Sequence, residues 1–327
     1  MVSSITSQSI DALYKASDLE EALLRIQPYI HRTPVHSSST VDRLCGARVF
    51  FKCENFQRMG AFKMRGAANA ILSLSEEQRS RGVATHSSGN FAQAIALAAK
   101  VLSIKSYIVM PSNSPAVKKA AVREYGGEII ECEPTQQARE ETLQQVVQRT
   151  GATFLHPYNQ REVILGQGTA ALELIQDTGG LDVILSPVGG GGLLGGTALA
   201  AHFFSPHSRV IAAEPQGAND AWQSLQAGHI IPQKAPDTIA DGLRTSLGDL
   251  TFPLLQQLVE RVICVEETEI VSALRLLMER MKLVVEPSGA VPLAALLKEK
   301  QQFRDCRVGV ILSGGNVDLK MLAGLFS

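Results

Sequence analysis

Short apolar and β-branched runs alternate with stretches of helical periodicity along most of the chain. Runs of this length, bounded by turn residues, predict buried strands. Residues 32–35 form a short extended entry, and the further predicted strands are 49–53, 83–86, 106–110, 128–133, 154–156, 182–188, 209–213, 262–265 and 308–312. Apolar residues recur at helical spacing in 16–30, 67–74, 92–102, 115–125, 136–149 and 317–326.

This regular alternation predicts an α/β fold with mainly parallel sheets flanked by helices. About ten strands are more than one compact open sheet usually holds, so we expect two lobes. The helix at 317–326 is expected to complete the core. We expect no further domain after residue 327.

Composition narrows the class of protein. Of 327 residues, 45% are hydrophobic and 19% charged, with a formal net charge of -1, which argues against a nucleic-acid binder and against a disordered chain. The five cysteines form no C-x-x-C pair, which favours a reducing compartment over a thiolate metal site. Residues 1–10 lack an apolar signal region, and no apolar run reaches membrane-spanning length. A cytosolic protein, neither exported nor embedded, is therefore expected.

Lys63 is the first candidate for chemistry. It lies between the apolar run 49–53 and the helical pattern from Ala67, so we expect it at a strand-to-helix junction. The partial positive charge of a helix N-terminus and an apolar neighbour, Phe62, would both lower the pKa of the lysine and free its amine as nucleophile or base. An ordinary solvated lysine in a first turn is the alternative that this stretch alone leaves open.

Four consecutive glycines, Gly189–Gly192, follow a predicted strand and precede a helical pattern that opens with Leu193. Glycines at such a junction let backbone N–H groups point at a bound phosphate, with the helix dipole adding to the attraction. The spacing does not match the dinucleotide G-x-G-x-x-G, and the Lys-Ser/Thr of a P-loop is missing. A phosphate cradle is the favoured interpretation, and a tight packed turn is the alternative.

Two polar turns, 87–90 and 313–316, follow other predicted strands. The carboxyl ends of strands are where open α/β sheets bind their ligands, although either turn alone could serve as an N-cap. A lysine amine, a phosphate cradle and two polar turns together suit a phosphorylated carbonyl cofactor held as a Schiff base. Pyridoxal phosphate meets that requirement.

The segments Ala61-Phe62-Lys63-Met64-Arg65-Gly66, Ser87-Ser88-Gly89-Asn90, the glycine loop and Leu312-Ser313-Gly314-Gly315-Asn316 resemble the serine racemase and serine/threonine dehydratase family. Its members are fold type II pyridoxal phosphate enzymes, similar to the β subunit of tryptophan synthase. The likeness runs from about Thr33 to Leu319. It implies a discontinuous large domain, residues 1–80 and 159–327, and a small domain, 81–158. The isoleucine-sensing domain of biosynthetic threonine deaminases would be absent.

The resemblance implies a role for each matching residue. Lys63 would hold the cofactor and act as base on one face, and Ser88 would be the acid/base on the other. The cofactor contacts implied are Phe62 on the ring, Asn90 on the ring hydroxyl, Ser313 on the pyridine nitrogen, and Gly189, Gly190, Gly191 and Gly192 on the phosphate, with Leu193 and Glu286 beside them. The expected reaction removes the α-proton and the β-hydroxyl and ends in a keto acid and ammonia. If Ser88 returns the proton, the same step racemises the substrate.

The run 214–220 is similar to the divalent-metal loop of the family. Glu214, the Ala218 carbonyl and Asp220 would supply the oxygen ligands that Mg²⁺ or Ca²⁺ prefers, with Mn²⁺ as a further candidate. From spacing alone, a solvated acidic loop is the alternative. The metal would have a structural and activating role.

Other positions bear on substrate and regulation. Phe91, Ala61 and Met59 depart from residues usual in racemases, and the Met-Gly-Ala-Phe-Lys variant also resembles members that act on threo-3-hydroxyaspartate. The candidate substrate residues are Ser87, Ser88, Arg139 and Arg244. The two arginines are included because a guanidinium binds a carboxylate bidentately. For Arg244, an ordinary surface arginine is the alternative. Residues similar to a nucleotide site, for ATP as activator, are Ser38, Ser39, Tyr125, Lys282 and Asn316.

The sequence thus predicts a homodimeric enzyme that eliminates water from L-serine, L-threonine or threo-3-hydroxyaspartate and racemises as a side activity. An enzyme that is primarily a racemase is the main alternative. A β-replacement synthase of the same fold and a non-catalytic phosphate-binding module are more remote ones.

Overall fold

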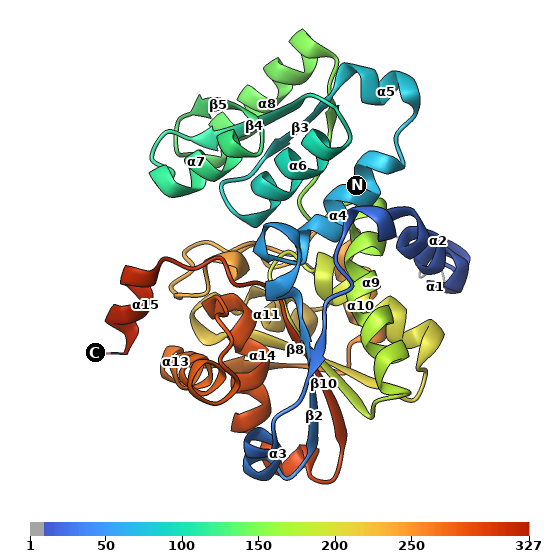
Figure 1. Ribbon diagram of the computed structural model, residues 1–327, viewed down its shortest axis with the longest axis vertical. Coiled ribbons are helices and arrows are strands. Elements are labelled where there is room, and N and C mark those ends of the chain that lie inside the picture. Colours follow the sequence, from blue (N-terminus) through green and yellow to red (C-terminus); the bar gives the residue numbers. More distant parts are fainter. Residues whose placement is uncertain (1–9, 327) are drawn as a thin grey trace.

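The computed structural model describes residues 10–326 and contains two β-sheets, each covered by helices (Figure 1). The first nine residues, on which the absence of a signal region was judged, lie outside the described part. The larger sheet has the order β1-β2-β10-β7-β8-β9. Its strands are β1 (Val35–His36), β2 (Arg48–Cys53), β7 (Val183–Pro187), β8 (Arg209–Pro215), β9 (Arg261–Val265) and β10 (Arg307–Leu312). All its pairs are parallel except β1 with β2.

The smaller sheet has the order β5-β4-β3-β6 and is wholly parallel. Its strands are β3 (Val83–His86), β4 (Ser106–Pro111), β5 (Glu128–Cys132) and β6 (Thr153–Phe154). The predicted α/β fold with two mainly parallel sheets is confirmed. The placement of the domain boundaries at residues 80 and 158 stays a prediction.

Helices cover both faces of both sheets, and four apolar clusters fill the layers between them. The helices are α1 (Ile10–Leu13), α2 (Ala16–Ile26), α3 (Ser39–Cys45), α4 (Lys63–Leu72), α5 (Glu76–Arg81), α6 (Asn90–Val101), α7 (Ala116–Glu124), α8 (Gln136–Thr150), α9 (Arg161–Thr178), α10 (Gly192–Phe204), α11 (Asp220–Ala227), α12 (Thr251–Leu258), α13 (Glu267–Leu276), α14 (Pro287–Lys298) and α15 (Leu319–Leu325). Neighbours along β7 alternate between faces: Leu185 joins the α13–α14 cluster and Ile184 the α9–α10 cluster, as a strand period of two requires. Within residues 10–326 no helix is both long and apolar enough to cross a bilayer.

The structure differs from the sequence prediction in two details. Lys63 does not directly follow a strand, because β2 ends at Cys53 and two 3-10 turns, η2 (Glu54–Phe56) and η3 (Arg58–Gly60), intervene. The last helix completes the core only in part, because Leu322 belongs to a core cluster and Leu325 and Phe326 pack against it. Only Leu322 of α15 is buried, whereas Leu319 is 71% exposed, and α15 projects from the side of the lower lobe in Figure 1. A helical apolar period does not reveal whether another surface of the chain covers it.

Candidate active site

A cleft of about 1350 Å³ lies between the two lobes, and its walls come from both. The carboxyl ends of β3, β7 and β10 open into it, as parallel sheets place their ligand sites. Most sequence-predicted site residues line this one cleft: Phe62, Lys63, Ser87, Ser88, Asn90, Tyr125, Arg139, Gly189–Gly192, Leu193, Arg244, Glu286, Ser313 and Asn316. Ser38, Ser39, Glu214, Ala218, Asp220 and Lys282 do not.

Lys63 is the first residue of α4 and projects into the cleft between two aromatic rings. Its Nζ lies 5.0 Å from the centre of the Phe62 ring and 5.6 Å from that of Phe91, and it donates a hydrogen bond to the Pro157 carbonyl at 2.9 Å. Burial lowers the pKa of the Lys63 amine to about 8, although the Glu286 carboxylate acts in the opposite direction. A neutral amine is therefore accessible near physiological pH.

Within residues 10–326, the backbone N–H groups of the glycine loop donate no hydrogen bond, so they are available to a ligand. Val188 N–H is bonded to Ala213 in the sheet, and the first bond of α10 runs from Gly195 N–H to the Gly191 carbonyl. The N–H groups of Gly189–Gly192 belong to neither ladder. Gly191 has φ +87, a conformation that favours glycine, and a Cβ on Gly190 would lie 2.4 Å from the Tyr158 ring.

The turn after β10 is attached to the segment that carries Lys63. Phe62 N–H donates to the Ser313 carbonyl at 3.0 Å, and Ala61 forms an isolated bridge with Gly314. Ser313, 2% exposed, lines the cleft beside them. Ser88 lines the cleft from the other lobe, in the turn between β3 and α6. The lysine and the two polar turns therefore line the same cleft.

A buried carboxylate joins the two lobes at the base of the cleft. Asn90 Nδ2 donates to both Glu286 oxygens at 3.0 Å, and Asn316 Nδ2 donates to Asn90 Oδ1 at 3.0 Å and to the Met59 carbonyl at 2.7 Å. Burial raises the pKa of Glu286 to about 7, opposed by the Asn90 hydrogen bonds. Met59 takes a left-handed conformation, φ 55.

The sequence did not predict a cluster of aromatic rings beside Lys63, formed by His86, Phe154, His156 and Tyr158. The carbonyl that accepts the Lys63 amine belongs to Pro157, between the last two of these residues. His156 Nδ1 accepts the backbone N–H groups of Tyr158 at 3.3 Å and Asn159 at 2.9 Å, which leaves Nε2 as the protonated nitrogen of a neutral ring. Burial lowers the pKa of His156 to about 4, and His86 and Lys63 add to the effect. The available signal was a Pro-Tyr-Asn turn directly after a strand.

Arg139 and Arg244 differ in how far they are engaged. Arg139 lies on α8 and lines the cleft, with its Nε buried and without a hydrogen-bond partner among residues 10–326. Arg244 is exposed and turns back, donating from Nε to the Thr238 carbonyl at 3.0 Å and from Nη2 to the same oxygen. Arg139 is thus the better placed of the two to bind a carboxylate.

The acidic loop lies outside the cleft. Glu214, fully buried, accepts the N–H groups of Ala221 and Trp222 at 2.9 Å each, and burial raises its pKa well above the usual value. Both Asp220 oxygens are buried and lack a hydrogen-bond partner within the described chain, and burial raises the Asp220 pKa to about 7. No set of three or more His, Cys, Asp or Glu in this part of the chain is arranged for a metal, so a cation here would depend on two carboxylates, backbone oxygen and water.

The five residues similar to a nucleotide site do not form one cluster in the single chain. Tyr125 and Asn316 line the cleft. Ser38 caps α3 by accepting Val41 N–H at 3.5 Å, and Lys282 Nζ donates to the Glu279 carbonyl. No hydrogen bond or ion pair within residues 10–326 joins the two groups.

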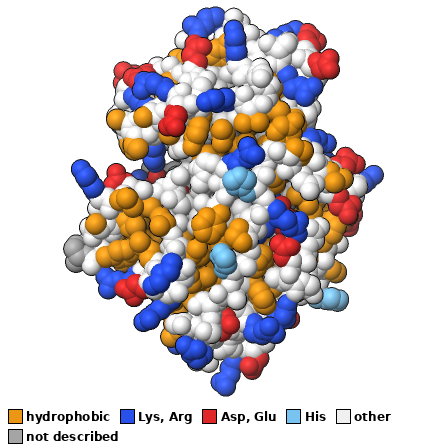
Figure 2. All heavy atoms as spheres, in the orientation of Figure 1, with side chains coloured by type: hydrophobic (Ala, Val, Ile, Leu, Met, Phe, Trp, Pro, Cys, Tyr) orange, Lys and Arg blue, Asp and Glu red, His pale blue; other side chains and the backbone are white. Residues whose placement is uncertain are grey.

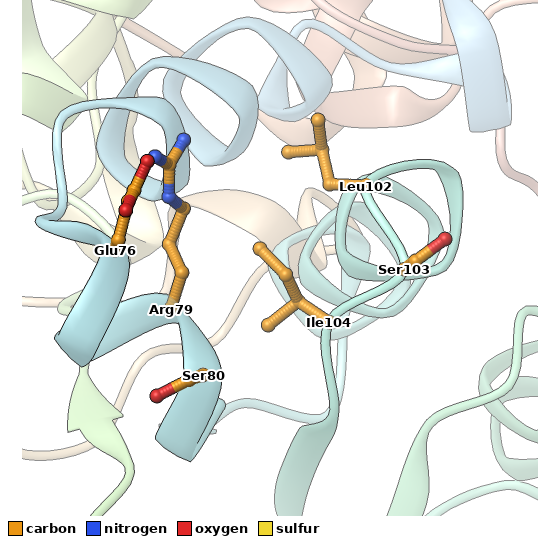
Figure 3. A pocket seen from close by; sticks show the side chains of 6 residues that line it. All are labelled: Glu76, Arg79, Ser80, Leu102, Ser103 and Ile104. Atoms are coloured by element: carbon orange, nitrogen blue, oxygen red, sulfur yellow. The ribbon is translucent and has the colours of Figure 1, made fainter.

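A second, smaller hollow lies between α5 and the end of α6 (Figure 3). Its lining residues are Glu76, Arg79, Ser80, Leu102, Ser103 and Ile104. None of them was a candidate in the sequence, and within residues 10–326 neither serine hydroxyl of the hollow is hydrogen-bonded to a side chain that could act as a base. The chemistry therefore belongs to the cleft between the lobes.

Comparison with known proteins agrees with this geometry. Residues 26–314 match the family described as pyridoxal-phosphate dependent enzyme, and the chain belongs to that family. The β-hydroxyaspartate dehydratase of Paracoccus denitrificans (strain Pd 1222) is 49% identical, over 93% of this chain and 97% of its own length. The serine racemase of Arabidopsis thaliana is 51% identical over 93% of each chain. The structure of maize serine racemase superposes with a TM-score of 0.92 at 48% identity, covering 98% of this chain and 97% of that one.

The fold is accordingly that of the fold type II pyridoxal phosphate enzymes. Within that class the chain is an enzyme of the lyase and racemase group, with pyridoxal phosphate as cofactor. The residues of the cleft fit this cofactor. Four N–H groups at a helix N-terminus, without an acceptor in the described chain, suit its phosphate, and a lysine with a depressed pKa suits its aldehyde.

Proposed function

We propose that the protein is an ammonia-lyase for a β-hydroxy amino acid with two carboxylates, of the 3-hydroxyaspartate type, and that racemisation is its side activity. Loss of water followed by hydrolysis would release a keto acid and ammonia. The observation that carries the choice of substrate is Arg139, a cation at the cleft whose buried Nε–H has no partner in residues 10–326. A relative named β-hydroxyaspartate dehydratase supports it.

Arg139 suits a second carboxylate because the two other cations at the cleft rim, Lys118 and Arg244, already have partners within the chain. Lys118 pairs with Asp241 at 2.7 Å, and Arg244 is bonded to the Thr238 carbonyl. A guanidinium with free donors binds a carboxylate bidentately. His86 lines the same cleft as Arg139. Burial and the charge of Arg139 lower the pKa of His86, which favours its neutral form. A substrate lacking the second carboxylate would leave the buried donor unsatisfied.

The remaining residues hold the cofactor and move protons. When bound, pyridoxal phosphate supplies the electron sink that acidifies the α-carbon. The Gly189–Gly192 N–H groups would bind its phosphate, and Ser313 and Asn90 would orient its ring. The Lys63 amine takes the α-proton on one face. Ser88, on the opposite lobe, would return a proton on the other face, which gives the racemase side activity.

The cation site is part of the proposal. Two buried carboxylates without a countercharge are unfavourable unless they are protonated or paired, and the unpartnered Asp220 oxygens support a bound cation. Glu214, the Ala218 carbonyl and Asp220 would hold Mg²⁺, or Ca²⁺ or Mn²⁺, with water completing the oxygen shell. ATP is left out of the proposal, because Ser38 and Lys282 are used within their own turns.

A homodimer is also proposed. Leu319 and Met321 of α15 are 71% and 40% exposed, and Figure 2 shows apolar side chains gathered on this side of the lower lobe. Apolar surface of this kind favours burial against another protein surface. A mass in solution of two chains, measured by light scattering, supports the proposal, and the mass of one chain contradicts it.

The substrate is tested by comparing keto-acid release from L-threo-3-hydroxyaspartate, L-serine and L-threonine with pyridoxal phosphate and Mg²⁺. We expect kcat/KM for hydroxyaspartate to exceed the others by about a hundredfold. Arg139→Ala should lower kcat/KM for hydroxyaspartate by about thirty- to a hundredfold, the usual effect of losing a charge-assisted contact, and leave serine within about threefold. Arg244→Ala is the matched control, with both substrates little changed. If the wild-type enzyme prefers serine or threonine, the proposed substrate is wrong. If it releases no keto acid from any of the three, the lyase assignment is wrong.

A further inference from the structure

We propose that residues 247–251 couple the cation site to the phosphate loop, and that Thr251 is the positioning residue on which this coupling depends. The inference rests on the cation site of the proposed function. It concerns only residues of this chain that lie between that site and the cleft.

The segment is packed toward both sites. On one side, Leu247 belongs to the same buried apolar cluster as Ala221, the residue that directly follows Asp220. On the other side, a Cβ placed on Gly191 would lie 3.1 Å from Leu247 Cδ2 and 2.7 Å from Thr251 Cβ. The segment therefore packs against the phosphate loop and shares an apolar cluster with the start of α11, the helix that opens with Asp220.

The Thr251 hydroxyl fixes the orientation of one peptide group in the phosphate loop. Thr251 is fully buried. Its Oγ1 donates to the Gly190 carbonyl at 2.8 Å, which is nearer than the Gly248 carbonyl at 3.2 Å, and accepts Gly248 N–H at 2.9 Å. A trans peptide group is planar, with its C=O and N–H on opposite sides. Holding the Gly190 carbonyl against α12 therefore directs the Gly191 N–H away from α12, toward the cleft that Gly191 lines.

Asn159 joins the same segment to the loop that contacts Lys63. Its Oδ1 accepts Leu250 N–H at 2.9 Å, and its Nδ2 donates to Asp249 Oδ1 at 2.6 Å. Two residues earlier, the Pro157 carbonyl accepts the Lys63 amine. One short segment thus contacts the phosphate loop directly and the lysine through a single loop.

A cation at Glu214 and Asp220 would neutralise these carboxylates and fix the loop beside Leu247. Ordering 247–251 would in turn hold the Gly191 N–H in its binding orientation before a phosphate arrives. Because coupling between two binding sites is reciprocal, cation and cofactor should raise each other's affinity by the same factor.

The test measures this factor in both directions. Pyridoxal phosphate is titrated into apoenzyme with and without Mg²⁺ and followed by visible absorption. Mg²⁺ alone is titrated into apoenzyme and holoenzyme and followed by the fluorescence of Trp222, the single tryptophan. The backbone N–H of Trp222 donates to the Glu214 carboxylate. For the wild type we expect a factor of about ten, at the lower end of usual coupling between sites.

Three variants separate positioning from general packing. Thr251→Val removes the hydroxyl and should reduce the factor to below about twofold, while apoenzyme binds Mg²⁺ within about threefold of wild type. Thr251→Ser keeps the hydroxyl and should keep the factor. Thr197→Val is the matched control, because Thr197 is equally buried, lies in α10, and has an Oγ1 without a hydrogen-bond partner in the described chain. Thr251→Ala replaces the valine variant if that protein does not fold.

Several outcomes would overturn the proposal: an undiminished factor in Thr251→Val, an equal loss in Thr197→Val, or no coupling in the wild type. Absence of any Trp222 response to Mg²⁺, Ca²⁺ or Mn²⁺ would overturn it together with the cation site. Keto-acid release measured without added cation is independent of all of these results, so the lyase assignment can stand or fail separately.

Discussion

Lys63 shows how one side chain acquires its chemistry from its neighbours. Phe62 and Phe91 exclude water from the amine, and the carboxylate that could stabilise its charge, Glu286, is itself buried with a pKa of about 7. Burial dominates, so the pKa of the amine falls to about 8. The same arrangement makes its protonation state sensitive to Glu286.

The first prediction concerns the pH dependence of cofactor loading. Only the neutral amine attacks an aldehyde, so the rate at which apoenzyme takes up pyridoxal phosphate should rise with pH and reach half its maximum near pH 8. Glu286→Gln removes a charge that raises the Lys63 pKa, so the midpoint should move downward. Stopped-flow absorption measures both, with Lys63→Ala as the blank. A wild-type midpoint near pH 10, or an upward shift in Glu286→Gln, contradicts the account.

At the scale of elements, a buried ionic network fixes α4 against β2 and α9. Arg65 donates from Nε to Glu54 at 2.7 Å and from Nη2 to Glu173 at 2.8 Å, and Lys52 bonds Glu173 at 2.7 Å. All four side chains are at most 2% exposed. Burial opposes ionisation of Glu173, but the charges of Arg65 and Lys52 hold its pKa below the usual value. The network lies two residues from Lys63 and fixes the start of its helix.

Breaking this network should strongly destabilise the fold. Glu173→Gln leaves two buried cations with Glu54 as the single buried carboxylate and the partly exposed Asp177 3.9 Å from Lys52, so we expect the free energy of unfolding to fall by about 3–5 kcal/mol. Glu260→Gln, which breaks the exposed Arg209–Glu260 pair, should change it by less than about 1 kcal/mol. Urea unfolding of the two apoenzyme variants makes the comparison, and equal effects would show that the network adds no more than a surface pair.

The network also marks what a sequence can and cannot predict. The turns at Ser87 and Ser313 were predicted because a strand, a turn and a helix are consecutive in the chain. The Lys52–Glu173 and Arg65–Glu173 pairs join positions 121 and 108 residues apart, and no local pattern specifies such partners. The Pro157 contact to Lys63 was missed for the same reason, at a separation of 94 residues. The exposure of α15 was misjudged because helical periodicity identifies which side of a helix is apolar. It does not show whether other residues of the chain pack against that side.

At the scale of the whole molecule, the two lobes meet across the cleft through few polar contacts. Asn90 and Glu286 join them at the base, and Lys118 on α7 pairs with Asp241 of η5 (Asp241–Leu243) at the rim, 2.7 Å apart. The rim side chains are 31% and 47% exposed, so water and salt screen their attraction. An ion pair this weak bridges the rim and contributes little to the attraction between the lobes.

The last prediction follows from that weakness. Asp241→Asn should leave the free energy of unfolding within about 1 kcal/mol of wild type, since an exposed pair contributes little. The same loss favours the open cleft, so KM should rise by up to about fivefold, which is 1 kcal/mol expressed as a ratio. Salt should raise the wild-type KM toward that of the variant and leave the variant nearly unchanged. Lys118→Met should raise KM by a similar factor. The double variant should raise KM no further than either single variant, because both changes remove the same contact. Additive effects on KM, or equal salt dependence in all three proteins, would show that the pair does not control closure.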